Sequence, residues 1–310
     1  MFLAVIDCVY YDAHTTLTGM EMKLINRISL ASVFTFAVCI PALQAEQWHQ
    51  FRGPSGLGHT SVTNLPMHWS DDAGNLAWKA PIDGLGWSSP IVEGDRIWVT
   101  TATDEGLSLR VVCLELKTGQ EIHNVELFRR ERALRIHRKN SHASPTPIIV
   151  GDRIFVHFGT YGTACLTLDG KIVWRKSIDY NHVHGPGGSP VVFEDLLIFS
   201  CDGGKQQFVI AIDCKDGTEK WRTDRPENDF GKKFAFSTPL LIDVESKPQV
   251  ISAGAGSVVA YDPRNGRQIW YAKYPGGYSV VPRPVYANGL LFVSSSYDRP
   301  RLMAIRPDGM

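Results

Sequence analysis

The sequence predicts an all-β protein built from about five copies of one short unit, because two markers recur in phase along the chain. The first marker is a glycine with a tryptophan four positions later in four of its five copies, and these copies are 45 to 51 residues apart. The second marker is a proline that opens a short apolar run. A period of this size with several short strands per copy is typical of a β-propeller, in which each copy forms one four-stranded antiparallel blade. The glycine pairs are Gly74 and Trp78, Gly119 and His123, Gly170 and Trp174, Gly217 and Trp221, and Gly266 and Trp270, and the prolines are Pro90, Pro147, Pro190, Pro239 and Pro284.

Each unit divides into four expected strands, a to d in chain order. Strand a begins at the proline, and a tight turn such as EGDR, VGDR or ANG leads into strand b. Strand c ends near CLEL, CLTL, AIDC, VAYD or MAIR, and strand d carries the tryptophan. Glycine closes the turn from c to d, because a positive φ costs little only for this residue. The glycines expected in this structural role are Gly119, Gly170, Gly217 and Gly266.

The repeated tryptophans are expected to pack between neighbouring blades. An indole offers a large apolar face and one N–H group that needs a partner, so burial between blades suits it better than exposure to a ligand. The expected inter-blade residues are Trp78, Trp174, Trp221 and Trp270. One position of strand c holds a small residue in every unit, so cysteine there is expected to act as a small apolar side chain. These residues are Cys113, Cys165, Ala211, Ala260 and Ala304.

Residues 1–45 are expected to be an N-terminal extension and a signal peptide, and residues 46–310 the repeat domain. Lys23 and Arg27 precede the apolar run ISLASVFTFAVCI, and PALQA follows it, which is the pattern of a secretory signal. The run is short for a transmembrane span, so none is expected in the mature chain. A buried N-terminal helix is the alternative. The protein is therefore expected in the periplasm or cell envelope, and its 32 basic and 32 acidic residues give no bias toward nucleic acid.

The connections from strand d to the next strand a are expected to surround the mouth of the central channel, because strand a is the innermost strand of a blade. Five side chains from five such connections mix aromatic and polar groups, as ligand sites do. The alternative is that they only fill the channel mouth. The candidate ligand-binding residues are Trp87, His142, His184, Phe236 and Arg283.

No metal site and no catalytic residue are expected. His182 and His184 have no cysteine or carboxylate at ligand spacing beside them, and no nucleophile motif of the G-x-S-x-G kind occurs. The segment FRRERALRIHRKN, inserted between the first and second units, holds six cationic side chains against one glutamate. A solvated excursion is the simplest interpretation, and docking of an acidic partner or an envelope lipid is the alternative.

The phrases CLELKTGQEI, AIDCKDGTEKW and AYDPRNGRQIW resemble the repeat of the PQQ-like β-propeller family, over about residues 74–309. That family includes quinoprotein dehydrogenases and BamB-like propeller lipoproteins. For a working quinoprotein, the resemblance implies a larger ring, acidic or amide calcium ligands, a catalytic aspartate and often adjacent cysteines. This sequence has no Cys-Cys pair.

We therefore expect an exported, non-enzymatic scaffold that binds a protein or ligand in the cell envelope and carries no cofactor. The alternative is a PQQ-dependent dehydrogenase, or a degenerate relative, with quinone and calcium at the channel mouth. The unit from Pro284 to Gly309 lacks a strand d, and residues 75–81 form a strand d without a, b and c. These two could close a five-bladed ring, but the resemblance to larger rings favours an open arc and a fragment of a longer propeller.

Overall fold

The computed structural model describes residues 4–5, 47–63, 65–70, 74–228, 231–295, 297–298 and 300–308. The expected signal segment therefore lies almost wholly outside the described residues. Within them, the secondary structure is nearly all β, apart from two 3-10 turns, η2 (Asp104–Gly106) and η3 (Gly159–Tyr161). None of the helices in this part of the chain is long and apolar enough to cross a membrane.

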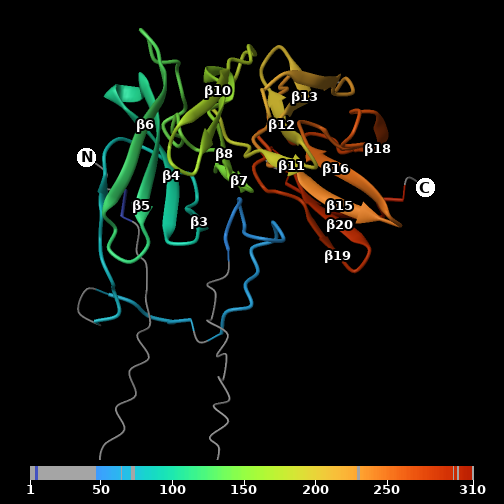
Figure 1. Ribbon diagram of the computed structural model, residues 1–310. Helices are drawn as coiled ribbons and strands as arrows, with labels where there is room; N and C mark the ends of the chain where they lie inside the picture. Colours follow the sequence, from blue (N-terminus) through green and yellow to red (C-terminus); the bar gives the residue numbers. More distant parts are fainter. Residues whose placement is uncertain are drawn as a thin grey trace, which may run out of the picture.

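Five antiparallel sheets follow one another along the chain as the blades of an open propeller, which confirms the predicted fold class (Figure 1). Blade 1 holds β3 (Ile91–Glu93), β4 (Arg96–Thr103), β5 (Ser108–Glu115) and β6 (Glu121–Arg129). Blade 2 holds β7 (Ile148–Val150), β8 (Arg153–His157), β9 (Thr163–Thr167) and β10 (Ile172–Lys176). Blade 3 holds β11 (Val191–Phe193), β12 (Leu196–Asp202), β13 (Gln207–Asp213) and β14 (Glu219–Asp224). Blade 4 holds β15 (Leu240–Val244), β16 (Lys247–Ala253), β17 (Ser257–Tyr261) and β18 (Gln268–Lys273), and blade 5 holds β19 (Val285–Ala287), β20 (Leu290–Ser294) and β21 (Leu302–Ile305).

The two ends of the arc differ from the regular blades. Blade 5 has three described strands, with β21 at its edge. At the other end, the strand expected over residues 75–81 is reduced to an isolated bridge residue at Trp78 and the short β2 (Pro81–Ile82). That strand pairs with β1 (Ala4–Val5) rather than with blade 5. The ring is therefore unclosed in the described structure.

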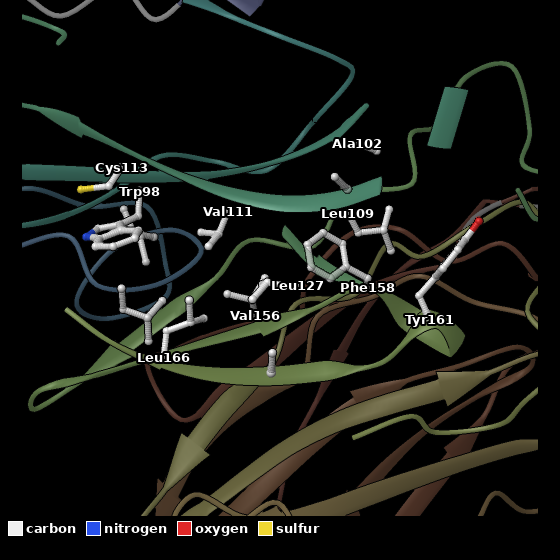
Figure 2. Close-up of a cluster of buried hydrophobic side chains, with 14 of the residues drawn as sticks. Trp98, Ala102, Leu109, Val111, Cys113, Leu127, Val156, Phe158, Tyr161 and Leu166 are labelled. Carbon is white, nitrogen blue, oxygen red and sulfur yellow. The ribbon is translucent and has the colours of Figure 1, made fainter. Parts of the chain in front are cut away.

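The hydrophobic core consists of layers between successive blades. Between blades 1 and 2, Trp98 and Val111 pack with Val156 and Leu166, and all four side chains are at most 1% exposed (Figure 2). Similar layers join blades 2 and 3, blades 3 and 4, and blades 4 and 5. Because each blade buries its faces against its neighbours, the stack holds the loops at the channel mouth in fixed relative positions.

The repeated tryptophans lie opposite the small residues of strand c in the same blade. Cys165 pairs with Trp174, Ala211 with Trp221 and Ala260 with Trp270, and His123 pairs with Cys113 in blade 1. A small side chain at this position leaves room for the indole beside it. The chain register then breaks at a β-bulge next to each pair.

The indole N–H group of each repeated tryptophan donates to the following blade. Trp174 Nε1 donates to the Cys214 carbonyl over 3.0 Å, and Trp221 Nε1 donates to the Pro263 carbonyl over 2.9 Å. Trp78 and Trp270 donate in the same way to Leu116 and Pro307. The structure thus places these tryptophans between successive units.

The marker glycine that a tryptophan touches belongs to the next unit rather than its own. A Cβ atom at Gly217 would lie 2.9 Å from Trp174, and one at Gly266 would lie 2.5 Å from Trp221. Both glycines have a φ of 72°. The c-to-d turn therefore requires glycine for two reasons, because the backbone is left-handed there and the indole leaves no room for a Cβ atom. Gly119 contacts Trp78 in the same way, and Gly170 faces His123.

Candidate functional site

The d-to-a connections surround a cavity of about 740 Å³, which we call the mouth cavity. Every one of the five connections contributes at least one residue to its wall, and residues 47–58, which we call the strap, contribute Phe51. The volume lies within the range of ligand sites. The lining residues are Phe51, Trp87, His137, Arg138, Lys139, Asn140, Ser144, Thr146, His184, Gly187, Ser189, Phe234, Phe236, Thr238, Tyr278, Ser279, Val281 and Tyr297.

One wall of the mouth cavity is a continuous belt of rings from four connections and the β20–β21 loop. The ring centroids of His137 and His184 are 4.9 Å apart, and those of His184 and Phe234 are 5.1 Å apart. Phe234 is followed by Tyr278 at 5.3 Å and then by Tyr297 at 5.2 Å. The first three contacts are edge-to-face and the last is tilted. Ring contacts of this kind fix the rings against one another, so the belt is a preformed aromatic surface.

Three of the five candidate residues from the sequence line the mouth cavity, namely Trp87, His184 and Phe236. Trp87 is 55% exposed, and its backbone N–H group donates to the Ala143 carbonyl over 3.0 Å. His184 has a φ of 67°, and its carbonyl accepts the His137 N–H. The insertion after blade 1 is thereby tied to the connection between blades 2 and 3.

His142 lies behind the cavity wall and does not face the cavity. It is 7% exposed, and its Nδ1 atom is 3.2 Å from the Tyr161 hydroxyl. Burial lowers the pKa of His142. Its ring fills the space beside Gly106, where a Cβ atom would approach to 2.1 Å.

Arg283 holds the strap against the blades and also stays outside the cavity. Its Nη1 atom donates to the carbonyls of Phe51 and Gly56, each over 3.0 Å, and its Nε atom donates to the Pro239 carbonyl over 2.9 Å. Burial and the nearby charge of Arg52 lower the pKa of Arg283 to about 10, so this guanidinium remains charged at neutral pH.

The strap runs along the inner strands of the arc before it reaches Arg283. Trp48 forms an antiparallel bridge with Val92 of β3, and the His49 carbonyl accepts the Ile149 N–H of β7 over 2.9 Å. Leu57 then packs against the layer between blades 4 and 5. The strap therefore spans the arc and places Phe51 in the cavity wall.

A buried polar network lies beneath the mouth cavity. Asp202 and Arg225 form a two-point ion pair with distances of 2.5 and 2.8 Å, and both side chains are at most 3% exposed. Burial is the largest influence on Arg225 and opposes its charge, but Asp202, Tyr261 and Tyr274 together outweigh burial and raise the pKa of this guanidinium. Arg225 also donates to the Ser252 carbonyl and hydroxyl. The pair is thus fully hydrogen-bonded, as a buried ion pair must be to persist.

The buried His157 and the partly buried His182 adjoin this network at a small cavity of about 10 Å³, which is enough for one water molecule. His157 Nδ1 is 2.8 Å from the Thr163 hydroxyl, and burial lowers its pKa to about 3. His182 has both ring nitrogens buried without a hydrogen-bond partner among the described residues. Burial, helped by the charges of His142 and Arg130, lowers the pKa of His182 to about 4. Both imidazoles are therefore neutral at pH 7.

The described lining of the mouth cavity does not match a calcium site. Calcium takes six to eight oxygen ligands, several of them carboxylates, and no described lining residue is an aspartate or glutamate. Among the described residues, no group of three or more His, Cys, Asp or Glu side chains could hold a metal ion. The residues that line the cavity thus do not fit a calcium-assisted quinone.

The sequence pointed to the loops but missed several wall residues. Phe234 and Tyr278 lie in the FAF and GYS phrases of the connections, close to the chosen candidates. Phe51 and Tyr297 lie outside the d-to-a connections, in the strap and in the β20–β21 loop. No repeat marker points to these two positions.

A family model described as outer membrane protein assembly factor BamB matches residues 59–192 and 108–308. The chain belongs to this family. Among curated proteins, none matches the sequence. Membership of the BamB family agrees with the PQQ-like repeat seen in the sequence.

Solved structures show the same propeller fold at low sequence identity. BamB from Moraxella catarrhalis is 17% identical with a TM-score of 0.54, and the match covers 76% of this chain and 65% of that one. A europium-containing methanol dehydrogenase is 12% identical with a TM-score of 0.56, covering 73% and 57%. Quinohemoprotein alcohol dehydrogenase from Comamonas testosteroni is 13% identical with a TM-score of 0.58, covering 85% and 48%. The matches span from about half to just under two thirds of these proteins, so the likeness concerns fold alone.

Proposed function

We propose that the chain is an exported, non-catalytic scaffold of the cell envelope that binds a partner protein at the mouth cavity. The observation that carries this proposal is the aromatic wall, which loops from all five blade connections and the strap build together. Loops held on a rigid β framework commonly carry binding residues. The description of the family as an outer membrane protein assembly factor supports an envelope setting.

The exposed rim favours a protein partner over a small molecule. Trp87, Val281 and Tyr297 are 55%, 60% and 64% exposed beside the cavity. A small ligand inside the cavity would leave much of the surface of these side chains in water, whereas a protein would cover more of it. Clustered exposed apolar side chains around a pocket mark interaction sites, and aromatic residues dominate binding energy there.

The charges at the rim indicate what kind of partner segment fits. Arg138 and Lys139 line the cavity, and no described lining residue carries a negative charge. Opposite charges steer association and select partners. We therefore expect a partner segment with aromatic or aliphatic side chains next to acidic ones.

Site-specific photo-crosslinking in intact cells tests this proposal. A photoreactive amino acid at Val281 sits on the cavity wall, and one at Val173, 43% exposed on β10, serves as a matched control on the outer strand of blade 2. We expect a defined envelope protein to crosslink from Val281 and not from Val173. Equal capture from both positions, or none from Val281, would contradict the proposal.

The second candidate is a quinone-dependent dehydrogenase or a degenerate relative that binds a quinone without calcium. The aromatic belt favours it, because flat rings stack well against such a wall, and two of the similar structures are dehydrogenases, one of them a quinohemoprotein. The absence of carboxylates from the described lining speaks against the calcium-assisted form. Quinone titration separates the two candidates.

A further inference from the structure

A second hollow of about 530 Å³ lies outside the mouth cavity, beside the arginine-rich insertion. The two share no lining residue. Arg130 and Arg135 of the insertion, together with Lys205 of the β12–β13 loop, bring three positive charges to this hollow, against one carboxylate from Asp179. The electrostatic balance of the hollow therefore favours an anion.

These cations have no acidic partner in the described structure. Arg129, the first arginine of the insertion, pairs with Asp104 and Glu126. Arg130, by contrast, donates to the Thr160 carbonyl over 3.1 Å, while Arg135 and Lys205 have no ion pair with any described residue. Their charges are consequently available to a ligand.

Arg130 is held in place before any ligand binds. Its guanidinium carbon lies 4.6 Å from the centroid of the Tyr161 ring, and the hydroxyl of that tyrosine accepts the Leu134 N–H over 2.8 Å. The insertion is thereby fixed against blade 2 at this point. A preformed arginine loses less conformational entropy on binding than a free one.

His182 gives an independent reason to expect a ligand in this hollow. Its two ring nitrogens are buried and unpartnered among the described residues, and its side chain lines both this hollow and the cavity of about 10 Å³ below. A neutral imidazole offers one donor and one acceptor. A water molecule in the small cavity would satisfy one nitrogen, and a ligand group would satisfy the other if the ring turned it toward the hollow.

We propose that this hollow binds the phosphate group of a ligand through Arg130, Arg135, Lys205 and His182. Phosphate offers more negative charge than a single carboxylate and several acceptor oxygens, which matches three cationic donors. A singly protonated phosphate also supplies a hydroxyl donor to an unpartnered imidazole nitrogen. The hollow shares no lining residue with the mouth cavity, so the phosphate site can be tested independently of the proposed partner binding.

Titration of the full chain with inorganic phosphate at constant ionic strength, followed by ³¹P line broadening, tests this site. We expect Arg135→Gln and Lys205→Gln each to weaken phosphate binding by roughly five- to tenfold, since each removes one charge-assisted contact. Arg132→Gln is the matched control, because Arg132 is exposed in the same insertion and outside the hollow. It removes the same charge and should change affinity less than about twofold.

Three outcomes would overturn the proposal: no phosphate binding, an equal effect of all three substitutions, or acetate binding as tightly as phosphate. Binding assays with glycerol 3-phosphate and with vesicles containing phosphatidic acid show whether the phosphate group belongs to a soluble molecule or to a lipid. If the wild type, but not Arg135→Gln, binds the vesicles, the ligand is a lipid headgroup. If only the soluble phosphates bind and depend on Arg135, the ligand is a free metabolite. Either result supports the phosphate site.

Discussion

At the scale of single residues, different aromatic side chains hold the blades together and line the mouth cavity. The repeated tryptophans are largely buried and donate to carbonyls of the next blade. Trp87, in contrast, is 55% exposed at the mouth cavity and belongs to no repeat position. The tryptophans that are in phase with the repeat are therefore structural, whereas the exposed indole of Trp87 is free to contact a partner.

Trp174→Ala should lower the free energy of unfolding by about 3 to 5 kcal/mol. The substitution removes an indole that is 8% exposed and leaves a cavity between blades 2 and 3. His123→Ala is the internal comparison, because His123 holds the equivalent position in blade 1 and is less buried. Equal midpoints in denaturant for the two variants would show that the repeated tryptophan does not wedge neighbouring blades.

The buried His157 makes stability depend on pH. Burial lowers its pKa from the ordinary 6.5 to about 3. Between pH 6.5 and pH 3, the imidazole is therefore protonated in the unfolded chain and neutral in the folded chain. Its contribution to stability is intact above pH 6.5 and falls as the pH drops toward 3, with a limiting slope of about 1.4 kcal/mol per pH unit. Chemical denaturation of the wild type and of His157→Gln from pH 7.5 to 4 should give a flatter profile for the variant. Parallel profiles would contradict this assignment.

At the scale of elements, the strap contributes more to the site than its lack of regular secondary structure suggests. It bridges β3 and β7 through main-chain hydrogen bonds, and its carbonyls at Phe51 and Gly56 accept hydrogen bonds from Arg283. The result is that one short segment ties the two ends of an unclosed arc to each other. Loss of the hydrogen bonds from Arg283 should therefore make the cavity wall at Phe51 more mobile.

Arg283→Met should increase amide hydrogen exchange in residues 47–58, because it removes three hydrogen bonds to carbonyls while keeping most of the side-chain volume. Blade 4 should keep its protection. Arg264→Met removes an exposed arginine paired with Glu194 and should leave the strap unchanged. If exchange in the strap stays the same in Arg283→Met, the strap is held by other contacts.

The regular strands could be predicted from the sequence. The contacts between successive units could be predicted only in part. Strand a begins one residue after each marker proline, at Ile91 in β3 and Val285 in β19 for example, because the proline has no N–H group to offer the sheet. The partner of each tryptophan could not be predicted, since the marker glycine it touches lies one unit further along the chain. The strap was also missed, because its contacts with Val92 and Arg283 join distant residues and follow no repeat.

At the scale of the whole molecule, the open arc combines repeated layers between blades with a mouth cavity that does not repeat. The layers between blades repeat from one end to the other. The mouth cavity does not repeat, since its walls are rings in some connections and small polar residues in others. Fold similarity to quinoproteins therefore says little about chemistry at this cavity.

Titration of the purified chain with PQQ in the presence of calcium tests the central claim, that the mouth cavity is a binding surface without a redox cofactor. Quinone absorbance and tryptophan fluorescence report binding, and Trp87→Phe identifies the signal from the cavity wall. The account predicts no saturable one-to-one binding at micromolar PQQ and no change in the quinone spectrum. Stoichiometric binding with a quinone absorbance change, lost on removal of calcium, would contradict it.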